Sequence, residues 1–200
     1  MSFWNSLFGR KKVSKEDVKS ESPFMPEKKD PVEISFANNF ISKGGRFLFS
    51  ESELDCKNFF NNILKDNNWN KSDLFSLDQK ISGTFDLETD INTSSVSDKK
   101  VAFIGCEFLI ANTGGILISS NQIKNLKLFQ LPENIIVKAK TSQFAIDVSE
   151  GMSKLKAFYS KNIPTNITTL NPKNSDKESD FLSHGNSSKT VSYTHLTLPT

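Results

Sequence analysis

The pattern of hydrophobic and polar positions is clearest between residues 101 and 120. Two apolar runs, 101–105 and 116–119, are joined by a polar break at 112–115. Runs that are nearly continuous in apolar residues are typical of strands buried on both faces, as in a parallel sheet covered by helices. The pattern therefore predicts buried strands here, at the centre of the fold.

Strand-like and helix-like segments alternate on both sides of this stretch. Ser50 followed by Glu51 and Glu53 predicts a helix N-cap, and Gly44-Gly45 predicts the end of the preceding helix. Such alternation is typical of a mainly parallel α/β sheet. The predicted helices are 33–43, 51–66 and 141–162, the predicted strands are 46–49, 73–78, 134–139 and 166–170, and 80–98 is predicted as a loop with at most a turn or short edge strand at 81–87.

The two ends of the chain differ from this pattern. Residues 1–12 form a short amphipathic patch, interpreted as a tail that folds onto its own domain in preference to a membrane-surface or partner-docking helix. Residues 13–31 are rich in Lys, Glu, Ser and Pro and are predicted to be a linker. The expected organisation is a flexible tail and linker at 1–31, an α/β domain at 32–190 and a non-native tail at 191–200.

The last ten residues, VSYTHLTLPT, are predicted to be neither a helix nor a natural terminal strand. They resemble a translated sequencing-adapter read, so they are excluded from functional reasoning. If they are foreign, one strand position of the sheet is either empty or occupied by foreign sequence.

Composition excludes several classes of function. The 200 residues, 36% apolar and 24% charged, suit one globular domain. A net charge of +2, without basic residues interleaved with aromatic ones, argues against nucleic-acid binding. Two Cys and two His cannot supply the about four ligands of a structural zinc or an iron–sulfur cluster, so we expect no metal and no cofactor. No apolar run approaches the roughly 20 residues of a membrane span, and no signal peptide is evident, so we expect a cytoplasmic protein.

Three motifs occur in an order that resembles the LUD domain, the lactate-utilisation family. They are Gly44-Gly45-Arg46-Phe47-Leu48, Ala111-Asn112-Thr113-Gly114-Gly115 and Leu182-Ser183-His184-Gly185-Asn186-Ser187-Ser188-Lys189. The resemblance runs from about residue 34 to 189. It implies a three-layer, Rossmann-like α/β fold similar to the ribose-5-phosphate isomerase, glucosamine-phosphate deaminase and CoA-transferase group. It also implies a partnership with iron–sulfur oxidoreductase subunits of a lactate utilisation complex.

The main candidate site is the break formed by Asn112, Thr113, Gly114 and Gly115. A Thr-Gly-Gly turn at the edge of a parallel sheet can present backbone N–H groups to a carboxylate or a phosphate. The alternative is a tight turn between buried strands, in which glycine is needed only for its backbone freedom.

Three other features have both a functional and a structural interpretation. Glu107 is either a ligand-binding carboxylate or, as favoured, a surface acid on a helix. The segment from His184 to Lys189 is either a small-anion loop, with Lys189 as a point charge, or a solvated turn. Cys106 has apolar neighbours and is interpreted as a packing residue rather than a nucleophile.

The function expected from this resemblance is that of an accessory or regulatory subunit of a bacterial iron–sulfur lactate oxidation system. Such a subunit is expected to bind its partner subunits, and a small anion is its candidate ligand. The alternative is a stand-alone enzyme that acts on a sugar phosphate or a CoA ester. No catalytic residue is assigned, and the oligomeric state is left open.

Overall fold

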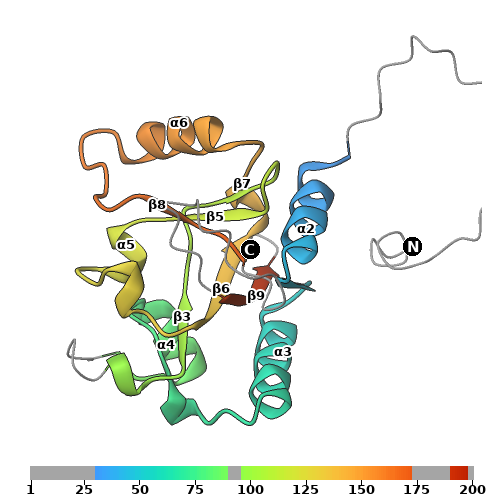
Figure 1. Ribbon diagram of the computed structural model, residues 1–200, viewed down its shortest axis with the longest axis vertical. Helices are drawn as coiled ribbons and strands as arrows, with labels where there is room; N and C mark the ends of the chain where they lie inside the picture. Colours follow the sequence, from blue (N-terminus) through green and yellow to red (C-terminus); the bar gives the residue numbers. More distant parts are fainter. Residues whose placement is uncertain (1–29, 90–95, 173–189, 198–200) are drawn as a thin grey trace, which may run out of the picture.

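The largest element of the fold is a five-stranded sheet in which every strand pair is parallel (Figure 1). The computed structural model describes residues 30–89, 96–172 and 190–197, the last segment as backbone only. In spatial order the strands are β1 (Arg46–Ser50), β9 (Thr190–Thr197), β6 (Asn134–Lys140), β3 (Val101–Ile104) and β2 (Leu74–Phe75).

A second, smaller sheet packs beside the first. Its strands, in spatial order, are β7 (Phe144–Ala145), β4 (Phe108–Ile110), β5 (Gly115–Ile118) and β8 (Thr168–Leu170). Strands β4 and β5 form an antiparallel hairpin, and β8 is antiparallel to β5, whereas β7 is parallel to β4. The sequence pattern does not predict this second sheet.

Helices cover both sheets. They are α2 (Val32–Ser42), α3 (Glu53–Asp66), α4 (Gln79–Phe85), α5 (Ser120–Ile123) and α6 (Val148–Tyr159), and short 3-10 helices span Lys71–Asp73, Val96–Asp98, Leu128–Gln130 and Thr141–Gln143. Helices α3 and α4 lie on one side of the parallel sheet, and the small sheet with α6 lies on the other (Figure 1). None of the described helices is long and apolar enough to cross a membrane.

Strand β3 shows how the layers are held together. Val101 and Phe103 pack with α3 and α4, whereas Ala102 and Ile104 pack with α2 and the small sheet. All four residues are at most 1% exposed, because successive side chains of a strand point to opposite faces and both faces are covered. The chain therefore has the predicted three-layer, Rossmann-like α/β fold with a mainly parallel sheet.

Several predicted elements are confirmed by the structure. Helix α2 ends at Ser42 with Lys43 as its C-cap, and Gly44 follows with a φ of 88°, in the left-handed region that glycine tolerates. Strands β1, β6 and β8 lie where the apolar pattern predicted them.

Three local predictions are wrong. The N-cap of α3 is Ser52, whose Oγ accepts from Asp55 N, because Ser50 is a buried part of β1. Residues 79–85 form helix α4, capped by Asp78, instead of a loop. The predicted helix 141–162 begins only at Val148, because residues 144–145 pair with β4 as strand β7.

The predictions for the two ends of the chain have different outcomes. The predicted patch at 1–12 lies outside the described residues. Of the two alternatives for the last strand position, empty or occupied by this segment, the structure has the second, because Thr190–Thr197 forms β9 and pairs in parallel with both β1 and β6. That sheet position is therefore occupied, whereas the foreign origin of the segment and the domain boundaries stay predictions.

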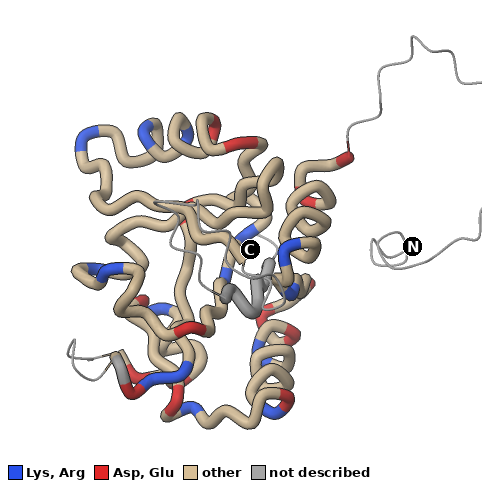
Figure 2. Tube along the Cα trace, in the orientation of Figure 1, with Lys and Arg blue, Asp and Glu red and all other residues tan. Residues whose placement is uncertain are grey.

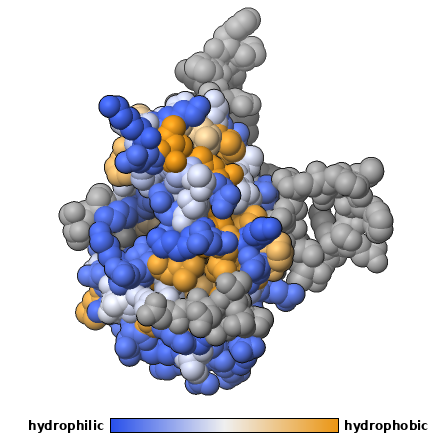
Figure 3. Space-filling view, turned by 90° about the vertical axis from the view of Figure 1, so that its left-hand side faces the viewer, coloured by the Kyte–Doolittle hydropathy of each residue, from blue (hydrophilic) through white to orange (hydrophobic). Residues whose placement is uncertain are grey.

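Charged side chains are distributed unevenly over this fold. Figure 2 shows Lys and Arg, with few acidic residues, along the edge where α5 and the C-terminal end of α6 lie. Figure 3, which faces that edge, shows apolar residues at the surface among hydrophilic ones. This edge is therefore both basic and partly apolar.

Candidate functional site

A cavity of about 860 Å³ lies where the parallel strands β1, β2, β3 and β6 end. In open α/β sheets, ligands bind outside the carboxyl ends of the strands, so this is the position at which a ligand site is expected. The cavity is lined by Glu51, Ser52, Glu53, Asp78, Gln79, Lys80, Ile81, Gly83, Thr84, Gly105, Cys106, Gln122, Lys138, Ala139, Lys140 and Gln143.

The charged groups of this cavity are not equally available to a ligand. The Nζ of Lys138 lies 3.9 Å from Glu53 Oε1, and Asp78 Oδ1 accepts from two backbone N–H groups of α4. Lys80 and Lys140, in contrast, form no ion pair with any other residue that the structure describes. These two lysines are therefore the cations best placed to meet an anionic ligand.

A buried polar cluster adjoins the cavity and is centred on Glu107, which is 7% exposed. Its Oε1 accepts from Ser119 Oγ at 2.6 Å and from Asn121 Nδ2 at 3.1 Å. Gln122 Nε2 donates to the same oxygen at 3.2 Å, and Tyr159 OH donates to Oε2 at 3.0 Å. The prediction of a surface acid on a helix is therefore wrong, because Glu107 lies buried in the connection between β3 and β4.

The cluster fixes the orientation of a cavity residue. Gln122 lines the cavity, and its side chain is held by Glu107 on one side and by the backbone N of Ser119, at 2.8 Å, on the other. Burial, and then the charge of Glu107, raise the pKa of the Tyr159 hydroxyl, so Tyr159 keeps its proton and remains a donor at neutral pH. Glu107 thus acts as an acceptor that joins α5, α6 and the hairpin.

Cys106 lines the same cavity but is only 4% exposed. Burial raises the pKa of its thiol strongly, and the negative charge of Glu107 adds to this effect. The thiol is therefore protonated at neutral pH, in agreement with the interpretation of Cys106 as a packing residue.

Both cysteines are expected to react slowly with Ellman's reagent at pH 8 in the native protein. Burial raises the pKa of Cys56 as well as that of Cys106. Each unit of increase in a thiol pKa lowers the thiolate fraction about tenfold. We expect labelling more than about tenfold slower than in urea, where both thiols should react fully. Rapid labelling of either thiol in the native protein would contradict the buried environment.

The predicted anion-binding turn, residues 112–115, forms the connection of the β4–β5 hairpin. The backbone N of Asn112 donates to Ile146 O at 2.9 Å, and that of Gly114 donates to Ile110 O at 2.8 Å. The backbone N of Gly115 donates to Thr113 Oγ1 at 3.2 Å. Three of the four N–H groups of the turn therefore already have acceptors within the protein.

The carbonyl groups of this turn hold it against the end of α2. Asn39 Nδ2 donates to Ala111 O at 2.8 Å, and Lys43 Nζ donates to Thr113 O at 2.6 Å. Gly114 has a φ of 65° and lies against the backbone of Phe40. These contacts support the structural interpretation of the glycines, and an anion-binding role of the turn stays a prediction.

The sequence pattern therefore predicts some of these residues and not others. Of the predicted ligand residues, 112–115 lie in the turn, Glu107 adjoins the cavity, and His184 and Lys189 lie outside the described residues. Some of the missed cavity residues, such as Glu51 and Lys140, lie at the ends of predicted strands, whereas others lie in α4 and α5. The position of Glu51 and Lys140 at the ends of parallel strands was the signal that could have identified them.

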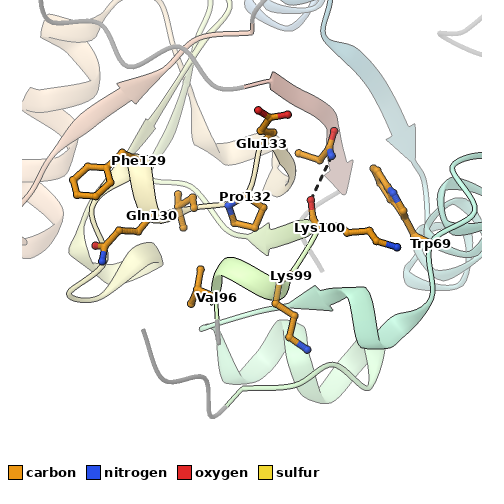
Figure 4. A pocket seen from close by; sticks show the side chains of 10 residues that line it. Trp69, Val96, Lys99, Lys100, Phe129, Gln130, Pro132 and Glu133 are labelled. Carbon is orange, nitrogen blue, oxygen red and sulfur yellow. Dashed lines mark hydrogen bonds between the residues drawn. The ribbon is translucent and has the colours of Figure 1, made fainter. Parts of the chain in front are cut away.

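A second cavity, of about 630 Å³, lies at the opposite edge of the parallel sheet, where β3 and β6 begin (Figure 4). Trp69, Phe129 and Pro132 contribute to its walls. Its charged groups are partly engaged, since Lys100 Nζ lies 3.1 Å from Asp73 Oδ1. The amino ends of parallel strands rarely bind ligands, so we regard the first cavity as the candidate site.

Fold and cavity together define a Rossmann-like α/β domain with a ligand-sized cavity at the carboxyl ends of its parallel strands. No protein-family model and no curated protein matches the chain. Among solved structures the chain is similar to a DUF162 family protein from Deinococcus radiodurans, with 13% sequence identity and a TM-score of 0.58. The match covers 84% of this chain and 96% of that one. At this identity the likeness shows a shared fold.

Proposed function

We propose that the chain is an accessory or regulatory subunit of a bacterial iron–sulfur lactate oxidation system. It binds the iron–sulfur oxidoreductase subunits and a small anion. The observation that carries this proposal is the ordered set of motifs that resembles the LUD domain.

The second of these motifs packs against α2, the helix that comes just before the first motif, and this contact supports the proposal. The segments 44–48 and 111–115 are more than sixty residues apart in sequence, yet Lys43, just before the first, donates to Thr113 in the second. Asn39 and Phe40 contact the same turn. Two motifs that are distant in sequence therefore adjoin the same contact, between the end of α2 and the turn at 112–115.

The cavity at the carboxyl ends of the strands supports the anion-binding part of the proposal. Lys80 and Lys140 supply positive charge without a partner carboxylate among the described residues. Gln122 adds an amide held in place by Glu107. A small carboxylate such as lactate needs one cation and a few fixed donors, which this cavity offers.

A stand-alone enzyme for sugar phosphates or CoA esters is the second candidate. It requires a reactive acid or lysine at a strand end, and Glu51, Asp78 and Lys140 occupy such positions in the cavity. Glu107 is a poor candidate for this role, because four donors already surround its carboxylate. The two candidates differ in whether the isolated chain recognises phosphosugars and thioesters.

Affinity purification from the native host is the experiment that tests the subunit proposal. A tagged chain is expected to co-purify with proteins that carry iron–sulfur clusters, detected by their visible absorption and by mass spectrometry. A chain that purifies alone under gentle, anaerobic conditions would contradict the proposal.

A thermal-shift screen separates the two candidate functions. A ligand at 100 times its dissociation constant is expected to stabilise the protein by about 2.7 kcal/mol. We expect a shift with lactate or a similar small carboxylate, reduced in Lys140→Ala and retained in Lys57→Ala, a lysine on α3 outside the cavity. A shift with phosphosugars or CoA thioesters alone would favour the enzyme.

A further inference from the structure

Two segments of the chain are basic without any acidic residue. Residues 108–132 and 151–172 contain five lysines and no Asp or Glu, although the whole chain has 25 basic and 23 acidic residues. The five are Lys124, Lys127, Lys154, Lys156 and Lys161. Such segregation of charge within a nearly neutral protein is a feature of surfaces that attract oppositely charged partners.

The two segments meet at one edge of the molecule. Asn121 Nδ2 at the start of α5 donates to Tyr159 OH at the end of α6, at 2.8 Å. Ser120 and Thr165 exchange two further hydrogen bonds, of 2.8 Å and 3.1 Å. Lys124 and Lys161 flank this joint in sequence, and Figure 2 shows basic residues along the edge where α5 and the end of α6 lie.

Most of these lysines are available to a partner. Lys154 is engaged, because its Nζ lies 2.9 Å from Glu150 Oε1. Lys124, Lys127, Lys156 and Lys161 are exposed and form no ion pair with any described residue. Their charges are therefore uncompensated within the described part of the chain.

Large apolar side chains stand among these lysines. Phe158 is 78% exposed and Phe129 is 72% exposed, whereas most other phenylalanines of the described chain are buried. The ring of Phe158 packs edge-on against Tyr159, with 4.9 Å between centroids, and Lys127 Nζ lies 5.9 Å from the centroid of Phe129. Exposed aromatic rings held by neighbours are typical of interface hot spots, because they bury a large area at a small cost in entropy.

We propose that this surface, formed by Lys124, Lys127, Lys156, Lys161, Phe129 and Phe158 and here called the basic face, docks a protein partner with acidic side chains around an apolar centre. The inference rests on the proposed function and assigns this partner to the iron–sulfur subunits of the complex. Unpaired lysines complement an acidic surface and speed the encounter, and the two phenylalanines supply apolar contact.

The Glu107 cluster joins α5 and α6, the two helices beside which much of the basic face lies. Tyr159, next to Phe158, donates to Glu107, and Asn121 of α5 donates to the same carboxylate. Side chains of α5 and α6 are therefore held in one arrangement before a partner arrives. A rigid surface loses less conformational entropy on binding than a mobile one.

The test measures the affinity of the 200-residue chain for co-expressed iron–sulfur subunits, by biolayer interferometry. Lys124→Glu/Lys161→Glu is expected to weaken binding about 100-fold, since like charges at an interface are strongly unfavourable. Phe158→Ala is expected to weaken it about tenfold. The matched control, Lys57→Glu/Lys65→Glu on the exposed side of α3, is expected to bind like the unmodified chain. Binding of the unmodified chain should also weaken as ionic strength rises.

Every other outcome overturns the proposal, and each outcome shows which part of it is wrong. If the complex forms and the face variants bind normally, the docking surface is wrong and the proposed function stands. If the unmodified chain forms no complex, both are wrong. If Lys124→Glu/Lys161→Glu instead abolishes binding to phosphatidylserine vesicles and leaves the protein complex intact, the face docks a membrane. A last outcome concerns the chain itself. If neutralising Asp176, Glu178 and Asp180 makes residues 156–163 of the isolated chain exchange hydrogen faster, the basic face is covered by the chain's own segment 176–180 and not by a partner protein.

Discussion

Replacing Glu107 by alanine is expected to lower the free energy of unfolding by about 3 kcal/mol, which corresponds to a fall in Tm of about 6–12 °C. The carboxylate is the common acceptor for Ser119, Gln122 and Tyr159, among others, and it is 7% exposed. Its removal leaves several buried donors without an acceptor. Urea denaturation followed by circular dichroism measures the change.

Two variants control this prediction. Glu107→Gln keeps one acceptor oxygen and is expected to lose about half as much stability as the alanine variant. Glu133→Ala removes an exposed carboxylate without a described partner and is expected to change stability by less than about 0.5 kcal/mol. Equal stability of Glu107→Ala and the unmodified chain would show that the cluster is not a structural unit.

Replacing Gly114 by alanine is expected to destabilise the protein by about 3 kcal/mol or more. Gly114 has a φ of 65°, a conformation that costs other residues about 1–2 kcal/mol. An added Cβ would also lie 2.5 Å from Phe40 N and 2.6 Å from Asn39 C. These are backbone atoms of α2, so the helix itself must move to relieve the contact.

Gly83 provides a matched control for this substitution. An added Cβ at Gly83 meets nothing within 4 Å, and the residue lies inside helix α4. Gly83→Ala is therefore expected to stabilise the protein by about 0.5–1 kcal/mol, because alanine favours the helix. If Gly114→Ala were as stable as Gly83→Ala, the close packing of the turn on α2 would be disproved.

The parts of the fold that the sequence predicted are those determined by local pattern. Strand β3 was recognised because it is a continuous apolar run, and α2 because Gly44-Gly45 ends it. Strand β7 was missed because residues 144–145 are set by their pairing with Leu109 and Ile110, which no local pattern records. Helix α4 was missed because its cap, Asp78, was assigned to a strand.

The candidate site was harder to predict than the fold, because long-range contacts bring its residues together. Glu107 has apolar neighbours in sequence on both sides, and its partners Ser119 and Gln122 follow 12 and 15 residues later. Tyr159 follows 52 residues later. Only the packing of α5 and α6 beside the hairpin brings these groups together, so the burial of Glu107 could not be predicted from its local sequence.

Growth on lactate as the only carbon source tests the proposed function most directly. A strain of the native host that lacks this chain is expected not to grow on lactate, to grow normally on glucose, and to recover growth on lactate when the chain is restored. Normal growth of the deletion strain on lactate would contradict a role in lactate oxidation.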